Sequence, residues 1–204
     1  MRLIALVLSA AFLLPALPAG ATTFCHEPAY PREAMFPDVE CWYAYYPGIE
    51  EAKHRGIVSG HPDGTFRPHD SVNRAELTKI AVAATLPASA IDSCVARLGS
   101  PFPDVPADSW FAPYVCAAKE AGVVGGYPDG TFRPGWTVSF VEAAKILSIS
   151  FSGWQQSPGG ERWYRPYVES LGAARAIPIS VPAFGKPLDR GEVAEIAARL
   201  AAGA

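Results

Sequence analysis

The sequence predicts an all-α fold made of three helix–loop–helix repeats, and three observations support this class. A segment repeats after 66 residues, glycine and proline interrupt the chain often, and a helix-capping pattern occurs three times. A single pair of short helices is too small to bury its own core. We therefore expect three pairs, six helices in all, to pack on one another and share their apolar faces.

The repeat is clearest in the first two copies. Shifted by 66 residues without a gap, residues 36–80 and 102–146 are identical at 21 of 45 positions, and both contain FPDV and PDGTFRP. A third copy matches at a shift of about 50 to 53 residues and has a loop three residues shorter in place of PDGTFRP. This period predicts modules at 31–93, 98–153 and 158–204, the third degenerate.

Prolines and glycines mark the first helix of each module. Pro47, Pro113 and Pro166 align across the copies, and proline is tolerated in a first helical turn because its missing amide would have no partner there. Gly56 and Gly122 predict where the first two of these helices end. With 20 Pro and 18 Gly in 204 residues, the helices should be short.

A capping pattern marks the second helix of each module. A good N-cap residue is followed three positions later by glutamate, and apolar residues then recur at helical spacing. In such a capping box each of the two side chains accepts a hydrogen bond from the other residue's backbone amide. The three pairs are Asn73 with Glu76, Ser139 with Glu142, and Asp189 with Glu192.

The first 21 residues are typical of a secretory signal peptide. A positive start is followed by an apolar run over 3–17 and by the small residues Ala19-Gly20-Ala21. A retained membrane anchor is the weaker interpretation, because the run is shorter than the roughly 20 residues a bilayer requires. We expect cleavage after Ala21, export, and no membrane-spanning segment in the remaining chain.

Charge and motifs exclude several classes of function. With 17 basic and 20 acidic residues, a net charge of −3 and no basic cluster, the chain is not expected to bind nucleic acid. No HExxH, phosphate-binding glycine loop or recognisable nucleophile occurs. Every recurring acidic residue also has a structural explanation, so we expect neither catalysis nor a cofactor.

The four cysteines predict disulfides in an oxidising compartment. Spacing favours Cys25 with Cys41 and Cys94 with Cys116, each pinning an irregular segment to the start of a helical one. A metal site is the competing interpretation, and the absence of any CxxC pair disfavours it.

The motifs resemble a known family. FPDV is followed by an aromatic segment, then by GIVSGHPDGTFRP and VNRAEL in copy one and by GVVGGYPDGTFRP and VSFVEA in copy two. This order resembles the S-layer homology domain, strongly in two copies and weakly in the third. The resemblance implies a three-pronged, pseudo-threefold helical assembly. It also implies that grooves between the prongs bind cell-wall polysaccharide, often carrying pyruvate ketals, near a Thr-Arg-Ala-Glu-like stretch.

Arg74 and Arg190 are the leading candidates for that binding. Each stands at the first position of a second helix, where free amides and the helix dipole favour an anion and a guanidinium suits a carboxylate. Solvated surface arginines are the alternative. Copy two has Phe140 there, so its groove is expected either to be silent or to stack on an uncharged sugar.

Aromatic residues are the second group of candidates. Sugar rings offer apolar faces that stack on aromatic rings, although tryptophans near a helix start also pack in cores. Phe66 and Phe132 are expected under the loop as core residues, and Asp63 and Asp129 as turn residues. The glycan-binding candidates besides the arginines are Trp110, Trp163, Tyr127 and Gly126, with Trp42 a weaker one.

Two functions follow as expectations. The first is a secreted cell-wall anchor that binds polysaccharide and stays at the cell surface. The second is a structural or adaptor protein that associates with itself or with another envelope protein.

Overall fold

The computed structural model describes residues 35–153, 160 and 162–203, and the predicted signal peptide lies outside this part. The described residues contain no strands, which confirms the all-α class, and none of their helices is long and apolar enough to cross a membrane. The helices are α1 (Tyr46–His54), α2 (Arg74–Thr85), α3 (Ala88–Leu98), α4 (Ala112–Glu120), α5 (Phe140–Ser152), α6 (Arg165–Ala173) and α7 (Arg190–Ala202).

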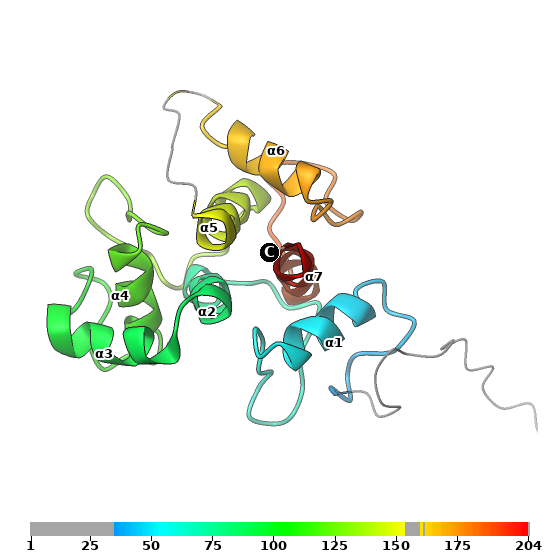
Figure 1. The fold of residues 1–204 in the computed structure, drawn as a ribbon, viewed down its shortest axis with the longest axis horizontal. Helices are drawn as coiled ribbons and strands as arrows, with labels where there is room; N and C mark the ends of the chain where they lie inside the picture. The colour runs from blue at the N-terminus through cyan, green and yellow to red at the C-terminus, as the bar shows by residue number, and fades with distance from the viewer. Residues whose placement is uncertain (1–34, 154–159, 161, 204) are drawn as a thin grey trace, which may run out of the picture.

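Three inner helices are surrounded by three outer ones (Figure 1). The second helices of the repeats, α2, α5 and α7, pack together in the centre. Each outer helix packs on the inner helix of a different repeat, so that α1 lies on α7, α4 on α2, and α6 on α5. Each prong therefore combines two repeats, and the first and last helices of the assembly are in contact.

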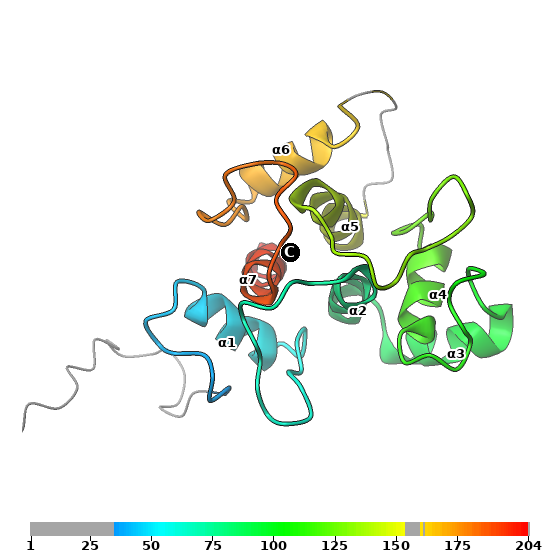
Figure 2. The ribbon, with the colours of Figure 1, turned by 180° about the vertical axis from the view of Figure 1, so that it is seen from behind.

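A ring of backbone hydrogen bonds joins the segments that lead into the inner helices (Figure 2). The Val72 amide donates to the Leu188 carbonyl at 3.1 Å, Leu188 to Val138 at 3.1 Å, and Val138 to Val72 at 3.2 Å. Because the same contact occurs three times in a closed cycle, the assembly is pseudo-threefold. The third repeat takes part in it fully although it lacks PDGTFRP.

The outer helices end in the same way but with different residues. After α1, the Gly56 amide donates to the Lys53 carbonyl and the Ile57 amide to the Ala52 carbonyl, and Gly56 has a φ of +72°. This ending needs a left-handed residue, which favours glycine. Gly122 has the same φ of +72° after α4. After α6, Arg175 occupies the position with a φ of +54°, and its backbone is strained.

Arg175→Gly is expected to stabilise the protein. Glycine removes the strain of the left-handed backbone conformation. It also raises the conformational entropy of the unfolded chain, but this cost is smaller than the strain removed, so the free energy of unfolding should rise by about 0.5–1 kcal/mol. Gly122→Ala is the matched control and should lower it by a similar amount. Urea unfolding of both variants tests this, and an unchanged or reduced midpoint for Arg175→Gly would contradict it.

The seventh helix, α3, was not expected. It lies between the first two repeats and crosses the end predicted for the first module at residue 93. Its start has no side-chain capping signal in the sequence, because Pro87 is its N-cap residue and makes no side-chain hydrogen bond. Its Ile91 and Cys94 side chains are buried, and it packs against α4.

The predicted pairing of Cys94 with Cys116 is confirmed. Its structural role differs from the expectation, because the disulfide joins helix α3 to the middle of helix α4 and not an irregular segment to a helix start. Cys41 is disulfide-bonded as well. Cys25, its predicted partner, lies outside the described residues.

Candidate functional site

The capping glutamates hold the starts of all three inner helices. In α2 and α7 the glutamate accepts from the N-cap amide and its own amide donates to the N-cap side chain, with distances of 2.8–3.0 Å. In α5 the Ser139 amide donates to Glu142 Oε2 at 3.0 Å. One carboxylate oxygen of each glutamate thereby accepts a hydrogen bond within its own helix start, and the other oxygen is available to accept one from a neighbouring residue.

The remaining amides at these helix starts are also occupied. The Arg74 amide donates to the Trp136 carbonyl at 2.9 Å, and the Ala75 amide to the Pro134 carbonyl at 3.0 Å. The first amides of α5 and α7 bond in the same way to the carbonyls of Lys186 and Asp70. The expectation that free backbone amides at these helix starts would bind an anion was therefore wrong. An anion must be bound by side chains at these positions.

Side chains from α2, the second-repeat loop and α5 gather around Arg74. We call this set the Arg74 cluster: Arg74, Tyr127, Arg133, Trp136, Glu142 and Lys145. The Arg74 guanidinium carbon lies 5.1 Å from the Tyr127 ring centre and 4.9 Å from that of Phe132. Within the described residues, its Nε is buried without a hydrogen-bond partner.

Arg133 approaches the Tyr127 ring from the loop and also contacts Trp136. Its guanidinium carbon lies 4.0 Å from the Tyr127 ring centre and 4.2 Å from that of Trp136. The Tyr127 hydroxyl donates to Glu142 Oε1 at 3.1 Å. The cluster therefore combines aromatic faces with guanidinium groups, and Glu142 is its single carboxylate.

Electrostatics in the cluster favour an anion. Burial lowers the pKa of the Arg74 guanidinium, although Tyr127 and Glu142 oppose this. Burial and the charge of Arg74 lower the pKa of Lys145. Burial alone would raise the pKa of Glu142, but hydrogen bonds from Ser139 and Tyr127 and the charge of Arg74 hold it below its usual value. Two partly desolvated cations, Arg74 and Lys145, thus lie beside one ionised carboxylate, while the third cation, Arg133, pairs with Asp129 at 2.8 Å.

Lys145 connects the cluster to the next prong. Its Nζ lies 5.6 Å from the Trp163 ring centre and 6.0 Å from that of Tyr167. Of the aromatic candidates from the sequence, Tyr127 therefore belongs to the cluster and Trp163 lies beside it. Trp110 lies elsewhere, with Lys79 Nζ 5.7 Å from its ring centre.

Arg190 is the sequence counterpart of Arg74 but has different surroundings. Only 9% of its surface is exposed, its Nε donates to the Phe66 carbonyl at 2.7 Å, and its guanidinium carbon lies 4.8 Å from the Phe66 ring centre. Burial lowers its pKa, and Glu76 and Asp70 oppose the shift. In the first repeat, His61 and Asp70 stand where the second has Tyr127 and Trp136. Unlike the Nε of Arg74, the Nε of Arg190 therefore has a hydrogen-bond partner within the chain.

The corner around Phe140 is filled by the protein itself. Phe140 is 2% exposed, so the alternative that its ring stacks on a sugar was wrong. Glu192 Oε1 accepts from both Ser180 and Lys186, and the Tyr45 hydroxyl donates to Ser180 Oγ at 2.7 Å. The chain's own lysine therefore neutralises the glutamate at this corner.

The other candidates have structural positions. Gly126 has a φ of +75°, and an added Cβ would lie 2.6 Å from Phe102 Cε1, so the backbone there requires glycine. Phe66 and Phe132 are buried, as predicted for core residues, and Trp42 is exposed. The Asp129 carboxylate accepts from the Thr131 amide at 3.0 Å and from Arg133 at 2.8 Å. Asp63 does the same in the first repeat, which confirms both as turn residues.

The aspartate of each FPDV motif is a residue whose role was missed from the sequence. Asp104 accepts from the Phe132 amide at 2.8 Å and from the Arg133 amide at 2.6 Å, and Asp38 repeats this in the first module. Arg133 has a φ of +61°, so Asp104 holds a strained residue of the cluster. The recurrence of FPDV was the available signal. The same holds for Arg133 and Lys145, which recur as Arg67 and Lys79.

Asp104→Asn is expected to destabilise the second-repeat loop. The amide side chain keeps the shape but loses one acceptor and the charge that attracts both backbone amides, which should lower the free energy of unfolding by about 1–3 kcal/mol. Asp108→Asn, at an exposed position nearby, is the control and should change little. Thermal unfolding of both variants tests this, and equal midpoints would contradict it.

Comparison with known proteins finds a family model that matches the first two repeats. The S-layer homology domain matches residues 36–78 and 101–144. Similar proteins include Cell surface glycoprotein 1 of Acetivibrio thermocellus (37% identical over 101 residues, 50% of this chain and 4% of that protein) and Surface layer protein of Brevibacillus choshinensis (29% over 112 residues, 55% and 10%). A third is the Cellulosome-anchoring protein of A. thermocellus (31% over 94 residues, 46% and 21%).

The similarity covers less than a quarter of the length of each of these relatives. The family match lies in the segments that contain FPDV, PDGTFRP and the first two capping boxes, and the third repeat is outside it. The first two repeats are thus similar to the S-layer homology domain, over the residues that the family model matches.

Proposed function

We propose that the protein is a non-catalytic, exported cell-envelope protein that binds a negatively charged cell-wall polysaccharide at the Arg74 cluster. The observation that carries this is the Arg74 Nε, which is buried without a partner in the described part of the chain. A desolvated cation is costly unless a counter-charge or acceptor reaches it. A carboxylate on the polymer, such as a pyruvate ketal, would supply the counter-charge at the part of the Arg74 side chain that is still exposed.

The rest of the cluster suits a sugar chain. Trp136 is exposed beside Tyr127, and Trp163 extends the aromatic surface past Lys145. Aromatic faces can pack against the apolar faces of sugar rings while the cations bind their charged groups. Neither Arg190 nor the Phe140 corner offers the same combination, so one strong site is proposed where the sequence suggested two.

Relatives support the cellular setting. Two of them are named as surface proteins and one as an anchoring protein. We propose that this chain likewise stays at the cell surface through the wall polymer.

Isothermal titration of residues 22–204 with polysaccharide released from purified cell walls tests the proposal. Saturable binding by the monomer is expected. The adaptor function predicts the opposite pattern, with concentration-dependent self-association in sedimentation velocity and no heat of polysaccharide binding. That pattern would overturn the proposed function.

A further inference from the structure

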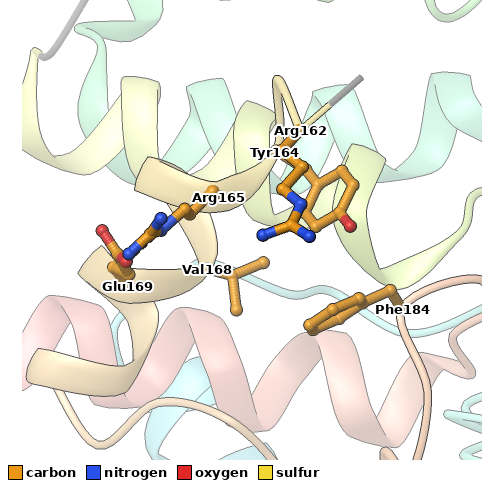
Figure 3. A pocket seen from close by; sticks show the side chains of 6 residues that line it. All are labelled: Arg162, Tyr164, Arg165, Val168, Glu169 and Phe184. Carbon is orange, nitrogen blue, oxygen red and sulfur yellow. Dashed lines mark hydrogen bonds and ion pairs between the residues drawn. The ribbon is translucent and has the colours of Figure 1, made fainter. Parts of the chain in front are cut away.

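A cleft of about 400 Å³ lies on the third repeat, outside the Arg74 cluster (Figure 3). The start of α6 and the residues just before it form one side, and the segment that leads to α7 forms the other. Its volume is within the range of small-ligand sites. The lining residues are Arg162, Tyr164, Arg165, Val168, Glu169 and Phe184.

Two aromatic rings form the apolar part of the cleft. The ring centres of Tyr164 and Phe184 are 5.0 Å apart and their planes are inclined by 48°. Phe184 is 52% exposed, although a ring of this size is normally buried. The Val168 side chain projects from α6 beside them (Figure 3). An exposed aromatic corner of this kind can receive the apolar face of a ring-shaped ligand.

The polar part of the cleft carries a net positive charge. Arg165 and Glu169 pair with each other at 2.7 Å. Arg162 makes no ion pair with any described residue, and Figure 3 shows its guanidinium directed into the space between Tyr164, Val168 and Phe184. Among the described residues, one cation in the cleft is therefore without a counter-charge, and its planar fork suits a carboxylate.

The third repeat has this cleft because it departs from the other two. The Val141 amide donates to the Phe184 carbonyl, as the Ala75 amide does to Pro134 and the Gly191 amide to Pro68. Phe184 therefore takes the place of a proline in a shortened loop. The repeat that lacks PDGTFRP therefore has an aromatic side chain at this position.

We infer that the cleft binds a single pyranose ring bearing a carboxylate, with the ring against Tyr164 and Phe184 and the carboxylate at Arg162. The inference rests on the proposed function only in taking the sugar from the same wall polymer. The cleft and the Arg74 cluster would then hold two parts of one polysaccharide. Linking two weak sites in this way raises the overall affinity without any further contact.

Amide NMR of ¹⁵N-labelled residues 22–204 tests the inference with defined sugars. The acidic probes are methyl glucuronide, N-acetylmuramic acid and a 4,6-pyruvate-ketal methyl hexoside, and N-acetylglucosamine is the neutral probe. At least one acidic probe should shift the amides of residues 162–169 and 183–185 saturably in the millimolar range. The neutral probe should bind about tenfold more weakly or worse.

Variants locate the binding. Phe184→Ala and Arg162→Gln should each weaken the shifts at the cleft by about tenfold. Ile179→Ala is the matched control, since Ile179 is 90% exposed on the same segment and does not line the cleft. Arg74→Gln should leave the cleft shifts unchanged, because Arg74 lies in the other site.

Two results would overturn the inference: no saturable shift at the cleft with any acidic probe, or equal affinity for the neutral one. Either result leaves the proposed function standing if polysaccharide binding still depends on Arg74. Conversely, loss of the Arg74 dependence with intact shifts at the cleft would contradict only the proposed function.

Discussion

Arg74→Gln is expected to weaken binding of the wall polysaccharide by about tenfold or more, which corresponds to about 1.4 kcal/mol. Glutamine keeps much of the length but removes the charge and the planar fork that would meet a carboxylate. Because the guanidinium also lies over Tyr127 and Phe132, the free energy of unfolding should fall by about 1 kcal/mol. Titration calorimetry and urea unfolding measure the two effects separately.

Arg190→Gln is the matched control for Arg74→Gln. The Arg190 side chain is nearly buried and donates to the Phe66 carbonyl, so this change should mainly lower stability, by about 1–3 kcal/mol. Binding by the folded variant should change little. Equal losses of binding in the two variants would show that the arginines act alike, against the distinction drawn from their surroundings.

Ending the chain at residue 153 is expected to abolish the cooperative fold of the two repeats that remain. Helix α1 packs on α7, and Gly48 lies so close to it that an added Cβ would meet the Glu195 side chain. Without α7, the buried face of α1 is exposed and the hydrogen-bond ring loses Leu188. Residues 22–153 should show no cooperative thermal transition by circular dichroism.

Adding residues 158–204 as a separate peptide distinguishes a lost interface from a merely shortened chain. The peptide supplies α6 and α7, so hydrogen-exchange protection should return at Ile49 and Ala52, two of the buried residues of α1. A cooperative transition in residues 22–153 alone would contradict the interlocked arrangement.

Local signals in the sequence were sufficient to place six of the seven helices found in the described part of the chain. Prolines in the first turn and capping glutamates act within one helical turn, and each recurs in all three copies, so their positions needed no knowledge of tertiary structure. Helix α3 has no such cap and depends on packing against α4. The pairing of α1 with α7 joins the two ends of the assembly, and no local pattern encodes it.

The site was predictable only in part, because equivalent residues have different neighbours. Arg74 and Arg190 stand at the same helical position, yet the Arg74 guanidinium lies over Tyr127 and Phe132, whereas that of Arg190 lies over Phe66. His61 stands at the position equivalent to Tyr127 in the first repeat. Those neighbours come from loops of another repeat. Which repeat contributes them is decided by the pseudo-threefold packing, so the helix start alone could not distinguish the two arginines.

The most direct test of the central claim compares the wall polysaccharide before and after its carboxylates are converted to neutral amides. Titration calorimetry with residues 22–204 should show affinity for the neutralised polymer falling by about tenfold, to the level that Arg74→Gln shows with the native polymer. Neutralisation should have little further effect on that variant. Undiminished binding of the neutralised polymer by the unaltered protein would contradict recognition of an acidic sugar by the Arg74 cluster.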